Sequence, residues 1–265
     1  VLTEKQTAHD LARRELDNAE FLVKHLATKP EKPGLADQKK QAAARVEPAQ
    51  KALKKAQDEL TPAAQKEATA RNELELARAA KRHDLAFTVD AEEADRLELS
   101  LDVFAAVLAD PSLAGWDGFG LAVQAYQKRA LAVVDHVAEL AQRLDRRMML
   151  RLVKGAYWDT EIKRAQERGL GDYPVFTRKA MTDLCYLACV RKLLSRRPRL
   201  YPQFATHNAL TIASVIEDAA GSHGYEFQRL HGMGEALYHA LLTEFPNLTC
   251  RVYAPVGGYA DLLAY

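Results

Sequence analysis

Cysteine is scarce in this chain of 265 residues, which contains Cys185, Cys189 and Cys250. A sparse and odd set of cysteines argues against a disulfide framework and predicts a reducing, cytoplasmic location. Cys185 and Cys189 lie four residues apart, a spacing that a metal site can use. Because no matching histidine or further cysteine lies near them in the sequence, buried thiols are the favoured prediction.

The sequence also lacks the features of membrane-spanning and nucleic-acid-binding proteins. It contains no run of about 18 apolar residues, which predicts no membrane-spanning helix, and its polar first residues predict no signal-peptide core. The 37 basic and 36 acidic residues nearly cancel, so this segment offers no basic surface for nucleic acid. Apolar residues make up 48% of the chain, which is ample for a buried core.

Residues 1–80 are low in glycine and lack the larger aromatic residues. They contain one glycine, Gly34, and neither tryptophan nor tyrosine. Apolar residues recur at helical spacing over 8–26, and they alternate steps of four and three over 42–60. These spacings predict amphipathic helices that pack as a hairpin or bundle. No catalytic chemistry is visible in this segment.

Two prolines are expected to limit the helices of this segment. Pro48 should kink or shorten the helix in which it lies, because proline lacks the N–H that a helix interior needs. Thr61 followed by Pro62 is a favourable start for a helix, so we predict a third helix from there to about residue 80.

From about residue 85 the pattern changes to apolar runs that alternate with amphipathic stretches. The apolar runs predict strands at 85–90, 119–124, 148–153, 203–206, 226–230 and 251–255. The other stretches predict helices at 92–108, 128–144, after 159, and at 177–195, 209–220 and 234–244, with a last helix starting at 261. Such alternation is typical of a parallel sheet.

Polar side chains lie in or just after each predicted strand, and they favour one parallel architecture over the other. They are Asp90, Gln124, the pair Arg151 and Lys154, His207, the pair Gln228 and His231, and Tyr253. A doubly wound sheet gathers its site at one crevice and usually has a glycine-rich phosphate turn, but no G-x-G-x-x-G motif occurs here. A barrel places its site at the carboxyl ends of all its strands. We therefore predict an α/β fold of the (βα)₈ TIM-barrel type.

The stretch 151–159 combines several features of a site. Arg151 interrupts an apolar strand, which is costly unless an anionic or electron-rich group meets it. Gly155 and Ala156 remove bulk where the strand ends, and two aromatic residues follow, of which the second is Trp158. A structural ion pair with a neighbouring carboxylate explains Arg151 as well as a functional role does.

Three chemistries are compatible with residues at the strand ends. Metal-assisted hydrolysis could use Asp90, His207 and His231, but no H-x-H or H-E-x-x-H motif occurs. Phosphate-sugar chemistry could use the pair Gly257 and Gly258, which is a weak signal.

The third chemistry is redox chemistry on a bound flavin. A flavin needs a cation near N5 and its pyrimidine edge, because reduction places negative charge there, and Arg151 could supply it. Gln124 could donate hydrogen bonds to the ring, Trp158 could pack on the adenine, and Tyr253 could wall a substrate pocket.

Residues from about 71 to 265 resemble the proline dehydrogenase domain of bacterial proline utilisation A proteins. The matching runs include FTVDAEEADRLELSLD (87–102), RLVKGAYWDTEIKRAQ (151–166), YPQFATHNA (201–209), FQRLHGMGEALY (227–238) and RVYAPVG (251–257). The resemblance implies a distorted (βα)₈ barrel that binds FAD and oxidises L-proline to Δ1-pyrroline-5-carboxylate by hydride transfer to flavin N5. It further implies that the electrons pass to a quinone, with peripheral contact to a membrane.

The resemblance also implies roles for residues at the matching positions. Catalytic roles fall on Arg151 near flavin N5, on Tyr253 and on Asp90. The cofactor would be bound by Gln124, Arg151, Val153, Lys154, Gly155, Ala156, Trp158, Thr206, His207, Asn208, Gln228 and Leu230. The substrate would contact Tyr253, Leu230 and Tyr265. No metal is implied.

Parts of the family pattern are not visible in this sequence. The family has two strands before the one that ends at Asp90, and it has a tandem arginine pair after the position of Tyr265. We therefore expect an incomplete barrel over 81–265 with a helical segment at 1–80. A homologue that keeps the scaffold without turnover is the alternative function, and a metal-dependent hydrolase is a more distant one. The oligomeric state stays open.

Overall fold

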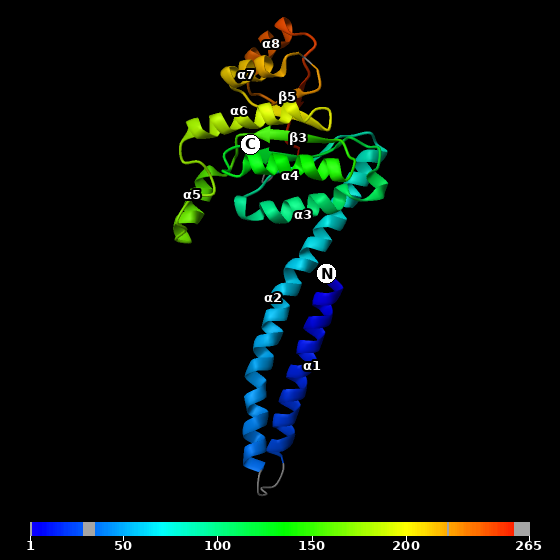
Figure 1. Ribbon diagram of the computed structural model, residues 1–265, viewed down its shortest axis with the longest axis vertical. Helices are drawn as coiled ribbons and strands as arrows, with labels where there is room; N and C mark the ends of the chain where they lie inside the picture. The colour runs from blue at the N-terminus through cyan, green and yellow to red at the C-terminus, as the bar shows by residue number, and fades with distance from the viewer. Residues whose placement is uncertain (1, 29–34, 222, 257–265) are drawn as a thin grey trace. The chain divides into compact units, whose positions relative to one another are not determined.

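A computed structural model describes residues 2–28, 35–221 and 223–256 of the chain. The chain divides into two compact units, Val1–Asn72 and Glu73–Tyr265 (Figure 1). Within the described residues, no helix has both the length and the apolar character needed to cross a membrane.

The first unit is a helical hairpin with a small apolar contact. Its helices are α1 (Leu2–Ala27) and α2 (Leu35–Arg82), of which α2 extends beyond the unit boundary. Leu26 and Ala42 are buried against each other, and Leu22 and Val23 pack beside them. Small residues such as Ala42 bury little area, so each turn of this hairpin contributes modestly to stability. The predicted all-helical hairpin is present in this unit.

The prediction of a third helix was wrong, because α2 continues through both Pro48 and Pro62. The Thr61 hydroxyl donates to the Gln57 carbonyl at 3.0 Å, so Thr61 bonds back within the helix instead of capping a new one. Each proline removes one N–H from the helix. The neighbouring alanines, lysines and glutamates favour the helix enough for it to continue.

The second unit contains six parallel strands that pair in chain order, β1 to β6. The strands are β1 (Phe87–Val89), β2 (Phe119–Gln124), β3 (Met148–Val153), β4 (Leu200–Ala205), β5 (Glu226–Leu230) and β6 (Cys250–Tyr253). A doubly wound sheet reverses its strand order at one point, and this sheet does not. The unit is therefore an incomplete barrel of the TIM type, as predicted.

Helices follow the strands and cover the outer face of the sheet. They are α3 (Leu97–Leu108), α4 (Ala130–Arg143), α5 (Trp158–Glu167), α6 (Lys179–Ser195), α7 (Ala209–Ala219) and α8 (Glu235–Glu244), with short 3₁₀ turns at Ala94–Arg96 and Pro111–Leu113. Helix α6 packs against both α4 and α7. The helix predicted from residue 261 lies outside the described residues.

The alternation of side chains along each strand places apolar residues on the outer face of the sheet and polar residues on the inner face. Successive side chains of a strand point to opposite faces of the sheet. In β3, Leu150 and Leu152 are fully buried, and Arg151 between them lies on the opposite, inner face. In β4, Phe204 is buried among the aromatic rings of Tyr225 and Phe227. The inner face is therefore the place where polar side chains gather.

Candidate functional site

Arg151 is the centre of the polar inner face. Its Nε donates to Gln228 Oε1 at 2.9 Å, its Nη1 lies 3.7 Å from Asp90 Oδ1, and its Cζ lies 5.4 Å from the centroid of the Tyr253 ring. The structure thus brings together four of the predicted site residues from β3, β5, β6 and the end of β1. The distance to Asp90 exceeds that of a hydrogen bond, so a carboxylate pair does not occupy the whole guanidinium.

A buried carboxylate lies behind Gln228, and the sequence analysis did not assign it a role. Glu226 is 1% exposed. Its Oε1 accepts from Gln203 Nε2 at 2.9 Å and from Gln228 Nε2 at 2.8 Å, and Arg251 binds both of its oxygens. One sequence feature could have revealed Glu226. Polar residues alternate in two neighbouring strands, Glu226 with Gln228 and Arg251 with Tyr253.

Gln124 joins two loops at the carboxyl end of β2. Its Nε2 donates to the Glu92 carbonyl at 2.7 Å, and its Oε1 accepts from the Ala156 N–H at 3.3 Å. Gly155 precedes Ala156 with φ +132°, and a Cβ at this position would lie 2.5 Å from the Tyr126 ring. Gln124 therefore holds the turn after β3, beside Val153, its partner in the strand register.

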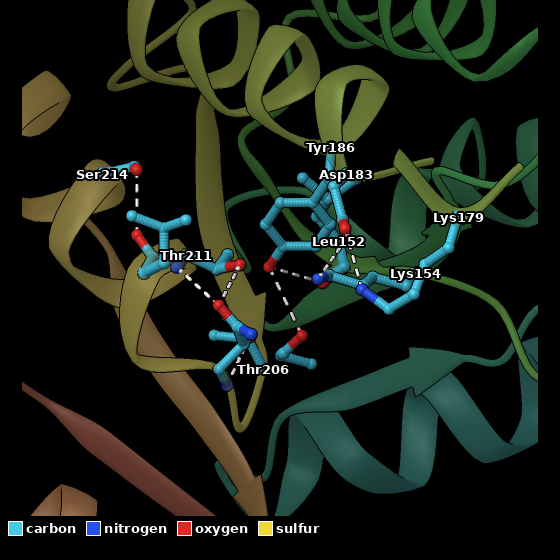
Figure 2. A network of polar contacts seen from close by, with 11 residues as sticks. Leu152, Lys154, Lys179, Asp183, Tyr186, Thr206, Thr211 and Ser214 are labelled. Carbon is cyan, nitrogen blue, oxygen red and sulfur yellow. Dashed lines mark hydrogen bonds and ion pairs between the residues drawn. The ribbon is translucent and has the colours of Figure 1, made fainter. Parts of the chain in front are cut away.

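Lys154 is bound by a helix instead of pointing freely into the site. Its Nζ lies 2.5 Å from Asp183 Oδ1 on α6, and Lys179 Nζ lies 2.8 Å from the other oxygen (Figure 2). Burial raises the pKa of Asp183, but the hydrogen bonds from the two lysines outweigh this and hold the pKa below its usual value. Tyr186 lies beside Lys154, and its hydroxyl contacts the Leu152 carbonyl.

Thr206 and Asn208 build the start of α7. Asn208 Oδ1 accepts from the Thr211 N–H at 2.9 Å and caps the helix, and its own N–H donates to Thr206 Oγ1 at 3.2 Å. Figure 2 shows Thr206 and Thr211 in this arrangement. The Thr206 carbonyl accepts from the Tyr238 hydroxyl at 2.8 Å. The cap therefore fixes the loop in which His207 lies.

His207 joins the ends of β4 and β5. Its Nε2 accepts from the Leu230 N–H at 3.1 Å, which requires the neutral ring because a backbone N–H only donates. Burial lowers the pKa of His207 below 6.5, and the nearby Arg229 charge lowers it further.

Acid should therefore destabilise the protein in part through His207. Because folding lowers the pKa of His207, the stability that its neutral ring contributes is complete above the unfolded pKa of 6.5. This contribution is lost as the pH falls toward and through the pKa of the folded state. We expect the thermal midpoint to fall from pH 7.5 to pH 5.0, and His207→Gln, which keeps an acceptor without a titrating ring, to reduce that fall. His136→Gln, at an exposed position of α4, is the control. An equal fall in wild type and His207→Gln would contradict this prediction.

Trp158 begins α5 and presents its ring to the surface. Its Nε1 donates to the Phe176 carbonyl at 2.8 Å, and the residue is 41% exposed. Tyr157 beside it is 36% exposed. The ring is therefore oriented by one hydrogen bond and keeps an open face.

These residues fit a bound flavin on three observations. Arg151 Nη1 lies 3.7 Å from Asp90 Oδ1, which is longer than a hydrogen bond, so a donor remains for a ligand. Gln203 Oε1 is buried and has no hydrogen-bond partner among the described residues, which suits an N–H donor. Trp158 offers a flat exposed ring. The donor, acceptor and aromatic surface that a flavin needs are thus present.

The other two chemistries find less support in the described residues. Across 2–28, 35–221 and 223–256, no group of three or more His, Cys, Asp or Glu side chains is placed to hold a metal. His207 uses its Nε2 as an acceptor from Leu230. Gly257 and Gly258, and the predicted substrate residue Tyr265, lie outside the described residues.

The parallel strands and the polar residues at their carboxyl ends define a protein of the α/β-barrel class with its candidate site at the strand ends. Residues 2–265 match the family model described as "Proline dehydrogenase". The chain belongs to the proline dehydrogenase family, which is flavin-dependent.

Similar proteins agree with this assignment. The chain is 53% identical over 193 residues to "Bifunctional protein PutA" of Escherichia coli, covering 70% of this chain and 15% of that protein. It is 28% identical over 191 residues to "Proline dehydrogenase 2" of Bacillus subtilis, covering 70% of this chain and 54% of that protein. The chain thus spans about one seventh of the length of its curated PutA relatives.

Solved structures show the same fold. A mutant of Bradyrhizobium japonicum Proline Utilization A is 69% identical, with a TM-score of 0.76 over 77% of this chain and 21% of that one. Proline utilization A from Bdellovibrio bacteriovorus, inactivated by N-propargylglycine, is 25% identical, with a TM-score of 0.67 over 98% of this chain and 28% of that one.

Proposed function

We propose that this chain takes part in the FAD-dependent oxidation of L-proline to Δ1-pyrroline-5-carboxylate, with a quinone as the electron acceptor. The observation that carries the proposal is the position of the Arg151 guanidinium, between Gln228, Asp90 and the Tyr253 ring at the carboxyl ends of parallel strands. Membership of the proline dehydrogenase family supports the substrate and the cofactor.

The residues of the chain have separate roles in this proposal. Bound FAD supplies the oxidant, because its N5 accepts a hydride from the carbon next to the proline nitrogen. Arg151 places a positive charge where negative charge develops during that transfer. Tyr253 and Leu230 offer apolar surface to the proline ring, and Asp90 faces the same space.

The cofactor-binding residues extend from this centre along the strand ends. Val153, Gly155 and Ala156 lie beside the ring in the turn that Gln124 holds, and Lys154, paired with Asp183, lies near the ribose or phosphates. Thr206, His207 and Asn208 hold the polar tail, and Trp158 packs on the adenine. We assign this chemistry to residues 81–265 and regard residues 1–80 as a helical appendage.

The test is the visible absorbance of the 265-residue chain after it has been mixed with FAD and freed from unbound FAD. We expect a flavin band that retains its intensity with anaerobic D-proline and bleaches with anaerobic L-proline. A band that does not bleach would identify a homologue that binds flavin without turnover. A chain that retains no flavin would overturn the proposal.

A further inference from the structure

Glu226 is a buried charge that the roles above do not use. Its side chain is 1% exposed, whereas the Arg251 side chain that binds both of its oxygens is 52% exposed. A buried carboxylate is stable only when its partners replace the water that it has lost. Arg251 supplies the opposite charge, and the amides of Gln203 and Gln228 supply two more donors.

The carboxylate determines which way the two amides face. A carboxylate only accepts hydrogen bonds and a guanidinium only donates them. The Gln228 amide lies between one of each, so its nitrogen must face Glu226 and its oxygen must face Arg151. The same reasoning turns the Gln203 nitrogen toward Glu226, at 2.9 Å, and its oxygen then has no hydrogen-bond partner among the described residues.

We propose that Glu226 is a positioning residue for Arg151, acting through Gln228. It fixes the Gln228 amide so that an acceptor meets Arg151 Nε, and this hydrogen bond holds the guanidinium over Tyr253 and toward the flavin. The part of this inference that concerns the flavin rests on the proposed function. The part that concerns the Gln228 amide stands on the hydrogen bonds alone.

Two variants with the same charge separate this role from a general electrostatic one. Glu226→Gln keeps an oxygen that can accept from both amides and loses the pairing with Arg251, which can turn to solvent. Glu226→Met has a similar length but offers no acceptor, so the Gln228 nitrogen loses its partner and the amide is held from the Arg151 side alone. Glu217→Gln, on the exposed face of α7, is the control for a lost carboxylate.

The first measurement needs no flavin. Solvent exchange of the Gln228 side-chain amide protons is followed by ¹⁵N NMR, with the signal assigned by its loss in Gln228→Met. We expect slow exchange in wild type, Glu217→Gln and Glu226→Gln, and exchange at least tenfold faster in Glu226→Met. Equal exchange in Glu226→Gln and Glu226→Met would overturn the inference, whatever the flavin does.

The second measurement is made on the FAD-loaded chain. The two variants carry the same charge, so a difference between them reports the hydrogen bond to Gln228 and not the lost carboxylate. We expect the flavin reduction potential to be more negative in Glu226→Met than in Glu226→Gln, because Arg151 is then held less firmly toward the flavin. Reduction by L-proline should be slower in Glu226→Met by about ten- to a hundredfold, the value of one hydrogen bond to a charged group. Equal potentials would refute the link to the flavin. A wild-type chain that retains no FAD would refute the proposed function instead, and the exchange measurement would still decide the role of Glu226.

Discussion

Arg151→Met should weaken FAD binding and slow flavin reduction by L-proline by about ten- to a hundredfold each, because a hydrogen bond to a charged group contributes roughly 1.5–3 kcal/mol. Methionine keeps an aliphatic side chain on the inner face of β3 but has no donor and no charge. The hydrogen bond to Gln228 Oε1 and the cation above the Tyr253 ring are both lost. The flavin then lacks the positive charge that stabilises its reduced form.

The measurements are a titration of FAD fluorescence for affinity and anaerobic stopped-flow absorbance for reduction. Arg147→Met is the matched control, since Arg147 precedes the same strand at its other end and pairs with Asp117 at 3.2 Å on the surface. We expect this control to bind and reduce FAD as wild type does. If Arg151→Met also behaved as wild type in both assays, Arg151 would have no role at the flavin.

Strands β2 and β3 were predictable because each is an apolar run next to a glycine or a charged residue. The predicted ranges 119–124, 148–153 and 226–230 agree with β2, β3 and β5 to the residue. The start of β4 was missed, because Pro202 interrupts the run, yet the strand begins at Leu200 and pairs Pro202 with Leu150. An isolated sequence does not show that a neighbouring strand tolerates the missing N–H at that position.

Arg151 and Gln228 were predictable as candidate site residues, whereas Glu226, on the same strand as Gln228, was not. Arg151 stands out because a charge inside an apolar strand needs a partner. Glu226 did not stand out, because it begins its predicted strand, where a charge is ordinary. Its partner Arg251 lies 25 residues away, and only the register that pairs Gln228 with Arg251 brings the two together. The contact of Lys154 with Asp183 was missed for the same reason, since a helix supplies the carboxylate.

Gly155→Ala should be among the most destabilising single substitutions in the second unit. The backbone at Gly155 has φ +132°, where a side chain costs of order 1–3 kcal/mol. The added Cβ would also lie 2.5 Å from the Tyr126 ring, and overpacking of this kind costs roughly 1–3 kcal/mol more. Together these costs are a large fraction of the 5–15 kcal/mol that is typical of a whole protein's stability.

Tyr126 cannot simply move away from the new methyl group. It is 2% exposed, and its N–H donates to the Lys154 carbonyl at 2.7 Å, so its backbone is tied to the residue before Gly155. Ala156 on the other side donates to Gln124. A shift of this turn would therefore move Gln124, and any folded Gly155→Ala protein should also bind FAD more weakly.

A double-mutant cycle separates the two costs. Urea unfolding of Gly155→Ala, Tyr126→Ala and the double variant should give a coupling of about 1–3 kcal/mol, because removal of the ring relieves the clash but not the backbone strain. Gly169→Ala is the control, since Gly169 has φ +63° and a Cβ there would meet no atom within 4 Å. Gly169→Ala should therefore lose only the free energy of unfolding that the backbone conformation costs. A zero coupling would show that backbone conformation, and not contact with Tyr126, requires glycine at this turn.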